Sequence, residues 1–336
     1  MRKMFDGMAT PCNSPPVVTN DAPPRRTRGP HANRKHTMNL TDLIGLNTRT
    51  RTSIPRFSRS NGAASYTSRT GPIPTDHLRS IAPSIFAEDA HTSRSEKYSY
   101  IPTSEILTRL QAEGFQPYAV AQGGSRDATK RGFTKHLLRL RHESQALQVG
   151  GTHNEIVLLN SHDGTSSYRL MAGVFRLVCQ NGMVVADNLL EDIRIPHKGD
   201  VAGLVLDGCI SMLENLPIVS ESVREMEAIR LSPAEENAFA RAALIARYDD
   251  DTPPIQASDI IRPRRREDAD NTLWQTLNRT QENLIRGGVS YVQRDANGRR
   301  VARRETREIR GIDQNTTLNR ALWTLAEEMR NIKNAG

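Results

Sequence analysis

Alternating apolar and polar positions predict an antiparallel β-sheet in the middle of the chain. The most regular alternation runs over residues 133–142, where Leu138 and Leu140 face one way while Arg139 and Arg141 face the other, so the second face is expected to be strongly basic. Two later apolar runs, separated by the turn-forming sequence SHDGT, predict a hairpin of central strands. Strand patterns occupy the segments 115–122, 133–142, 155–160, 168–179 and 183–186. We therefore predict a sheet of about five strands, which is a typical size.

Helical periodicity dominates the second half of the chain. Asp200 can cap a first helix, 200–216, and a second helix is expected over 220–229. Ser232 and Glu235 have the spacing of a capping box. Further helices are predicted over 76–81, 102–114, 268–286 and 315–333. Strands followed by helices predict an α+β fold with a helical C-terminal half.

Composition separates an N-terminal tail from the rest. Residues 1–70 contain 12 lysines and arginines against 3 acidic residues, so that 34 of the 46 basic and 35 of the 38 acidic residues follow. This segment has too few apolar residues to offset its ordering entropy, and we predict a disordered basic tail. It is either an arm that binds nucleic acid or a solvated leader, and the charge block alone favours the leader. An α+β core domain is then expected over 71–252, with Pro253 and Pro254 opening a helical C-terminal region, 253–336.

Several motifs recur, in order, in a known family. They include EGFQP at 113–117, NSHDGTSSY at 160–168, FRLVCQNGM at 175–183, RIPHKGD at 194–200 and QENLIRGG at 281–288. On these motifs the chain resembles the bacterial family called domain of unknown function 932, which occurs in chromosomes, prophages and plasmids. The resemblance covers about residues 73–336 and implies kinship with proteins of mobile genetic elements. It implies no activity, because the family has none that can be carried over.

Two arginine clusters point to nucleic acid. One contains Arg262, Arg264, Arg265 and Arg266, and the other contains Arg294, Arg299, Arg300, Arg303 and Arg304 around a predicted turn at 295–298. Arginine binds phosphate through bidentate contacts, and a basic hairpin can clamp a nucleic-acid backbone. The alternative is a solvated surface neutralised by nearby acidic residues. We predict a non-enzymatic protein that binds DNA or RNA mainly through backbone phosphates.

The alternative to nucleic-acid binding is an enzyme whose polar site lies at the turn of Asn160, His162 and Asp163. Metal-dependent hydrolases use adjacent histidine and aspartate, but they close the coordination sphere with further ligands. Asp163 before Gly164 is typical of a turn, and turn formation explains the segment better than metal binding. We therefore predict no catalytic residue, no metal and no cofactor.

The cysteines and the apolar runs bear on the cellular setting. Cys12, Cys179 and Cys209 lie far apart in the sequence, which argues against a zinc site or a disulfide framework and favours a reducing cytoplasm. We find no apolar run of the length that spans a membrane, about 18 residues, so no membrane is expected as a partner. A homo-oligomer, or a protein-interaction module in conflict between element and host, stays open and would require an exposed apolar patch.

Overall fold

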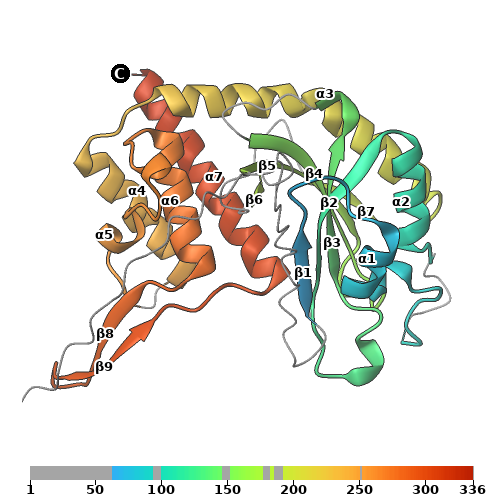
Figure 1. The fold of residues 1–336 in the computed structure, drawn as a ribbon, viewed down its shortest axis with the longest axis horizontal. Coiled ribbons are helices and arrows are strands. Elements are labelled where there is room, and N and C mark those ends of the chain that lie inside the picture. Colours follow the sequence, from blue (N-terminus) through green and yellow to red (C-terminus); the bar gives the residue numbers. More distant parts are fainter. Residues whose placement is uncertain are drawn as a thin grey trace, which may run out of the picture. The chain divides into compact units, whose positions relative to one another are not determined.

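An antiparallel sheet lies at the centre of the fold in the computed structural model (Figure 1), which describes residues 63–93, 100–145, 152–176, 182–184, 192–249 and 252–335. The strand order is β1-β2-β3-β4-β5-β6, and β7 also pairs with β5. The strands are β1 (Ala64–Thr67), β2 (Phe115–Gln122), β3 (His136–His142), β4 (Thr152–Asn160), β5 (Tyr168–Arg176), β6 (Gly182–Val184) and β7 (Ile193–Ile195). The predicted antiparallel sheet is confirmed, and with 7 strands among the described residues it is larger than expected.

The predicted central hairpin is formed by β4 and β5. Its register pairs Ile156 with Ala172 and Leu158 with Leu170, and all four side chains are buried. Aliphatic residues on both faces of these strands suit a position in the middle of a sheet. The end of the predicted second strand, including Cys179, lies outside the described residues.

Strand β1 lies within the segment that we predicted to be disordered. Ala64 pairs with Gln122 and Thr67 with Ala119 at the edge of the sheet, and the following Ser68 is buried. The predicted tail therefore extends too far at its C-terminal end. A strand of four residues has little pattern of its own, because its stability comes from hydrogen bonds to β2. Residues 1–62 lie outside the described part of the chain.

Three helices cover one face of the sheet, namely α1 (Thr75–Ile81), α2 (Thr103–Ala112) and α3 (Val201–Ala228). Their apolar side chains share a core with Leu138, Leu140 and Ile156 of the sheet. Helix α3 approaches β5 closely at Gly208, where a Cβ atom would lie 2.7 Å from Cδ1 of Leu170. A glycine here lets the helix lie directly on the strand.

Helix α3 is continuous over 28 residues, whereas the sequence predicted two helices. Pro217 stands inside it, and proline removes a helical hydrogen bond. Pro217 is exposed, while Leu216 and Val219 beside it are buried, so tertiary packing keeps the helix intact across the proline. By length and composition alone α3 could cross a membrane, contrary to our expectation; core helices of soluble proteins meet the same criteria. The helix contacts β4, β5, β7, α2, α6 and α7.

The remaining helices are α4 (Pro233–Tyr248), the short α5 (Ala257–Ile260), α6 (Leu273–Arg286) and α7 (Ile312–Ala335). The capping box is confirmed, since Glu235 N donates to Ser232 Oγ at 3.3 Å and Ser232 N donates to Glu235 Oε2 at 2.7 Å. Helix α6 begins later than predicted, because Thr272 caps it and Asp268 belongs to a preceding 3-10 turn. Trp274 of α6 and Trp323 of α7 are buried among these helices.

The start of α7 reaches the second face of the sheet. Ile312 packs there against a small apolar cluster of Val157, Leu159 and Met171. Both faces of the sheet therefore carry helix, with α1, α2 and α3 on one and the first turns of α7 on the other (Figure 1).

Candidate functional site

Two strands between α6 and α7, β8 (Ser290–Arg294) and β9 (Arg300–Glu305), form a second, two-stranded sheet. We call residues 290–305 the arginine ribbon. It extends away from the helices (Figure 1), and its register pairs Tyr291 with Arg304 and Val292 with Arg303. Since neighbouring residues of a strand point to opposite faces, arginines occupy both faces of the ribbon.

The turn of the arginine ribbon forms as predicted. Asp295 Oδ1 accepts hydrogen bonds from the amides of Asn297 at 2.9 Å and Arg299 at 2.8 Å. Gly298 adopts a φ of 75°, a conformation that glycine reaches without steric cost. The local sequence therefore specifies this reversal.

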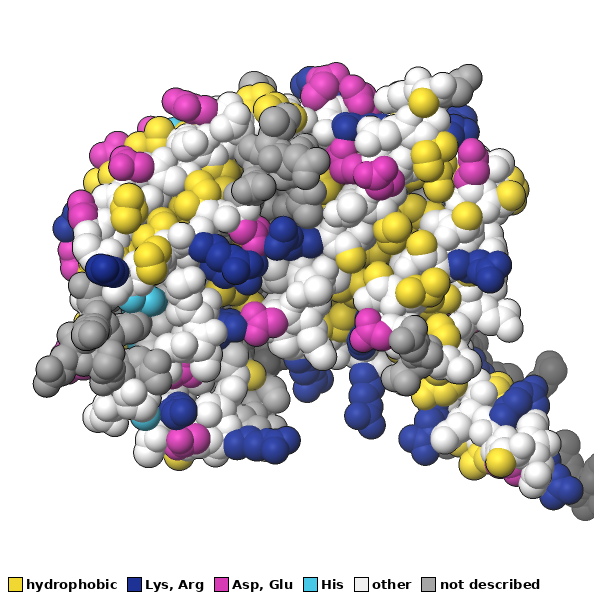
Figure 2. All heavy atoms as spheres, turned by 180° about the vertical axis from the view of Figure 1, so that it is seen from behind, with side chains coloured by type: hydrophobic (Ala, Val, Ile, Leu, Met, Phe, Trp, Pro, Cys, Tyr) yellow, Lys and Arg dark blue, Asp and Glu magenta, His cyan; other side chains and the backbone are white. Residues whose placement is uncertain are grey.

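The arginines of the ribbon carry uncompensated charge. Arg294, Arg299, Arg300, Arg303 and Arg304 are all exposed, and none forms an ion pair with another residue that the structure describes. Arg294 lies directly opposite Arg300, which places like charges together. In the rear view of Figure 2 the projecting segment at the lower right carries lysine or arginine side chains beside hydrophobic ones. The ribbon is thus a solvated, positively charged element.

Contacts at its root fix the ribbon to the helices. Gly288 N donates to Thr306 O at 2.8 Å, and Thr306 N donates to Val289 O at 2.9 Å. Arg264 donates from Nη2 to the carbonyl of Gly287. An isolated two-stranded hairpin is only marginally stable in water, so this anchoring is what holds the ribbon in place.

The first predicted arginine cluster divides into two kinds of residue. Arg264 also donates to Asn283 Oδ1 at 2.6 Å, and Arg265 pairs with Glu282 and with Asp268, the latter at 3.0 Å. These two guanidinium groups are used within the fold and join the segment before α6 to the helix itself. Arg262 and Arg266 are exposed.

The basic face predicted for β3 is largely neutralised. Glu155, which is fully buried, accepts from Nε of Arg139 and of Arg141, each at 2.6 Å. Lys135 binds the carboxylate of Asp313 at 2.6 Å. The expectation of a strongly basic face was therefore wrong, because the partners come from β4 and α7.

The three residues of the predicted polar turn, Asn160, His162 and Asp163, are all buried. Asp163 Oδ1 accepts from the amide of Thr165 at 3.0 Å and from its hydroxyl at 2.6 Å, and Gly164 has a φ of 80°. Burial raises the pKa of the Asp163 carboxyl, but the hydrogen bonds from Thr165 outweigh it and lower the pKa below its ordinary value. The turn chemistry expected of Asp163 and Gly164 is present.

Asn160 and His162 belong to a buried polar network beneath α2. Thr103 Oγ1 lies at its centre, 2.9 Å from His136 Nε2, 3.2 Å from His162 Nε2 and 3.2 Å from the hydroxyl of Tyr168. Asn160 Nδ2 donates to the same oxygen at 3.1 Å. The two imidazole rings are 5.3 Å apart. The sequence analysis named Asn160 and His162 as a possible polar site, and Tyr168 ends the same motif, but no local pattern indicated that Thr103 joins them.

Both histidines of this network are held neutral. Burial lowers the pKa of His136 to about 4. Burial, followed by the charges of His136 and His197, lowers the pKa of His162 to about 3. Such groups accept a proton only at the expense of the fold, so the network can couple folding to pH.

The described residues were considered as possible metal ligands and as reactive thiols. They include no group of three or more His, Cys, Asp or Glu side chains that could hold a metal ion. Burial raises the pKa of the Cys209 thiol to about 12, which keeps it protonated and unreactive. Cys12 and Cys179 lie outside the described residues.

Comparison with known proteins assigns the chain to a family. Residues 90–323 match the domain of unknown function DUF932. Two proteins of Escherichia coli K12, the UPF0380 proteins YfjQ and YafZ, are each 46% identical to the chain over 276 residues, which is 82% of this chain and 98% of theirs. No solved structure matches. The chain therefore belongs to the DUF932 family, as its sequence motifs had indicated.

Proposed function

We propose that this protein binds duplex DNA through the arginine ribbon, mainly at backbone phosphates. The observation that carries this proposal is the contrast between two sets of arginines. Those in the sheet, such as Arg139 and Arg141, are neutralised by a buried carboxylate, whereas the five of the ribbon have no ionic partner among the described residues. An anionic partner would relieve the repulsion between Arg294 and Arg300.

The form of the ribbon favours duplex DNA over RNA. The major groove of B-DNA admits a two-stranded β-ribbon, with arginines at the edges reaching the phosphates. The major groove of A-form RNA is too deep and narrow for such an element. Exposed Val292 and Val301, which are 40% and 61% accessible, can contact thymine methyl groups without imposing a strict sequence.

Residues beside the ribbon extend the proposed surface. Arg262 and Arg266 are exposed and flank Arg264, which contacts the root of the ribbon. The basic N-terminal segment adds further positive charge. In a mobile-element protein such binding would serve maintenance or recombination of the element's DNA, or its conflict with the host.

A salt titration of DNA binding tests the proposal. The full chain is compared with a variant in which Arg299, Arg300, Arg303 and Arg304 are changed to glutamine. Each neutralised phosphate contributes about 0.9 to the slope of log K against log salt, so losing four contacts flattens the slope by up to about 3.6. Because phosphate contacts do not read sequence, the change should be similar on unrelated duplexes.

A second variant controls for net charge. Arg109, Arg224, Arg230 and Arg241 are exposed and lie on or beside helices outside the ribbon. Changing them to glutamine removes the same charge and should leave the slope close to that of the natural chain. Equal slopes for the two variants would contradict the assignment to the ribbon, and tighter binding to duplex RNA than to duplex DNA would contradict the choice of DNA as the partner.

A further inference from the structure

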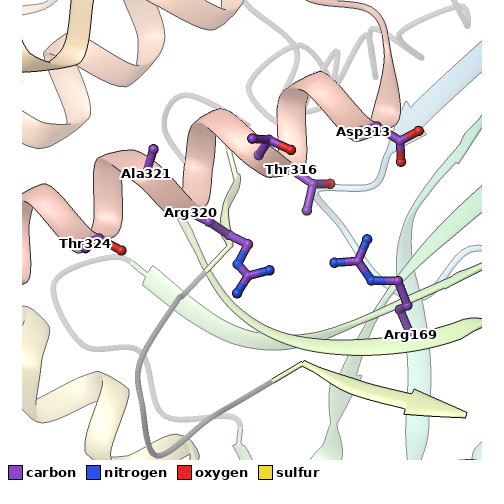
Figure 3. A pocket seen from close by; sticks show the side chains of 7 residues that line it. Arg169, Asp313, Thr316, Arg320, Ala321 and Thr324 are labelled. Atoms are coloured by element: carbon purple, nitrogen blue, oxygen red, sulfur yellow. The ribbon is translucent and has the colours of Figure 1, made fainter. Parts of the chain in front are cut away.

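A cavity of about 430 Å³ lies between β5 and the first turns of α7 (Figure 3). All of its lining residues except Ala321 carry polar side chains, namely Arg169, Asp313, Thr316, Thr317, Arg320 and Thr324. Arg169 and Arg320 point toward one another across the cavity, from the strand and the helix respectively, and Thr316 lies above the gap between them. The volume is in the range of sites that bind small molecules.

The sequence of α7 places this polar lining on one side of the helix. Asp313, Thr317, Arg320 and Thr324 follow one another at helical spacing, so they form a stripe along one face. Leu318, Leu322 and Trp323 occupy the other side and are buried against the helical part. A polar stripe on an amphipathic helix usually faces solvent, and Asp313, Thr317 and Thr324 are exposed, so the pocket between this stripe and the strand opens to solvent.

Positively charged side chains outnumber carboxylates around the cavity. Arg169 Nη2 and Arg320 Nη1 both donate to the same oxygen, Oδ2 of Asp192, at 2.5 and 2.7 Å. Asp313, the other carboxylate, is already bound by Lys135. Two guanidinium groups therefore share one carboxylate.

A hydrogen-bond donor without a partner also indicates that the cavity can hold an anion. Nε of Arg169 is buried and has no hydrogen-bond partner among the residues that the structure describes. Buried donors normally find an acceptor, and an orphaned one costs free energy. An oxyanion in the cavity would supply the missing acceptor and the missing negative charge together.

We propose that this cavity binds a phosphate group carried by a nucleotide-sized molecule or by the end of a nucleic-acid strand. Guanidinium groups bind phosphate oxygens through paired, charge-assisted hydrogen bonds, and the threonine hydroxyls can donate to the remaining oxygens. Phosphate binding here does not depend on the arginine ribbon, because no ribbon residue lines the cavity.

Thermal unfolding of the full chain tests phosphate binding. Inorganic phosphate, a 5′-mononucleotide, and an oligonucleotide with or without a 5′-phosphate are titrated at constant ionic strength against sodium chloride. Bound phosphate should raise the Tm in a saturable way. Arg320→Gln and Arg169→Gln should each weaken the apparent affinity about ten- to hundredfold, as expected for a lost hydrogen bond to a charged group.

The matched control is Arg330→Gln on the same helix. Arg330 pairs with Glu225 and Glu327 and does not line the cavity, so its loss should leave phosphate affinity unchanged. If Arg169→Gln does not fold, Arg320→Lys replaces it and should weaken binding less than Arg320→Gln, since it keeps the charge and loses the planar fork.

The source of the phosphate and the role of the ribbon are separated in the same assay. The oligonucleotides are also titrated against the variant lacking the four ribbon arginines, which should keep the phosphate response. Stronger binding of the mononucleotide than of inorganic phosphate supports the proposal and indicates a nucleotide. Stronger binding of the 5′-phosphorylated strand than of its unphosphorylated form supports it and indicates a strand end. A Tm rise no larger than that with chloride, or equal responses of the natural chain and Arg320→Gln, would overturn it.

Discussion

At the scale of single residues, Glu155 carries the clearest energetic consequence. Its carboxylate is fully buried and accepts from both Arg139 and Arg141. Glu155→Gln would leave two guanidinium groups without their counter-charge in the sheet. Breaking a buried ion pair in this way costs about 3–5 kcal/mol, and we expect that loss in the free energy of unfolding measured by urea denaturation.

An exposed ion pair supplies the comparison for Glu155. Glu105 pairs with Arg109 one helical turn away, and both side chains are about half exposed. Glu105→Gln should change the free energy of unfolding by less than about 1 kcal/mol, because solvent screens such pairs. Similar losses for the two variants would show that burial of Glu155 does not set its contribution.

At the scale of elements, two adjacent glycines decide how the arginine ribbon leaves α6. Gly287 has a φ of 65° and a ψ of −150°, and a Cβ atom there would lie 2.5 Å from the carbonyl oxygen of Thr306. Gly288 has a φ of 75°, but nothing lies within 4 Å of the same position. Gly287→Ala should therefore cost about 2–4 kcal/mol, combining backbone strain with a backbone collision.

Gly288→Ala isolates the cost of backbone strain. A side chain at positive φ costs about 1–2 kcal/mol, so this variant should be the milder of the two in urea denaturation. Gly287→Ala should also weaken DNA binding, because it displaces the strand that carries the ribbon. Equal effects of the two substitutions would mean that the close contact at Thr306 does not constrain the root.

At the scale of the whole molecule, the buried histidines make folding depend on pH. His136 and His162 have pKa values of about 4 and 3 in the fold, below the ordinary value of 6.5. Between these values the unfolded chain binds more protons than the folded one, so stability is complete above about pH 7 and falls as the pH falls. Below its ordinary pKa of 6.5 each histidine contributes about 1.4 kcal/mol per pH unit, so the two together give a loss of up to about 4 kcal/mol by pH 5.

Urea denaturation at pH 7, 6 and 5 measures this dependence. The window ends at pH 5 because carboxyl groups with lowered pKa, such as Asp163 and Glu235, contribute to acid destabilisation below it. His162→Gln should reduce the slope by up to about half, since it removes one of the two histidines whose pKa is strongly lowered in the fold. A free energy of unfolding that stays constant from pH 7 to 5 would rule out a neutral, buried pair.

Features that depend on neighbours along the chain could be predicted from the sequence. The bounds of β2 were predicted correctly as 115–122 from its apolar pattern, and the capping box at Ser232 and the turn after Asp295 were read from a few adjacent residues. The ribbon between Gly288 and Thr306 was likewise predictable as a basic hairpin. These elements are set by periodicity, capping and turn geometry, all of which act over short separations.

Contacts between distant segments determine which charged and polar residues are available for function, and these could not be predicted from local patterns. Arg264 and Arg303 belong to similar arginine-rich sequences, yet the first donates to Asn283 and to the carbonyl of Gly287, whereas the second has no ionic partner among the described residues. His162 follows a strand in a turn-forming sequence, but α2 buries it beside Thr103. Arg320 shares Asp192 with Arg169 across 128 residues of sequence. Ion pairing and burial depend on contacts between distant segments, and local patterns carry no information about those contacts.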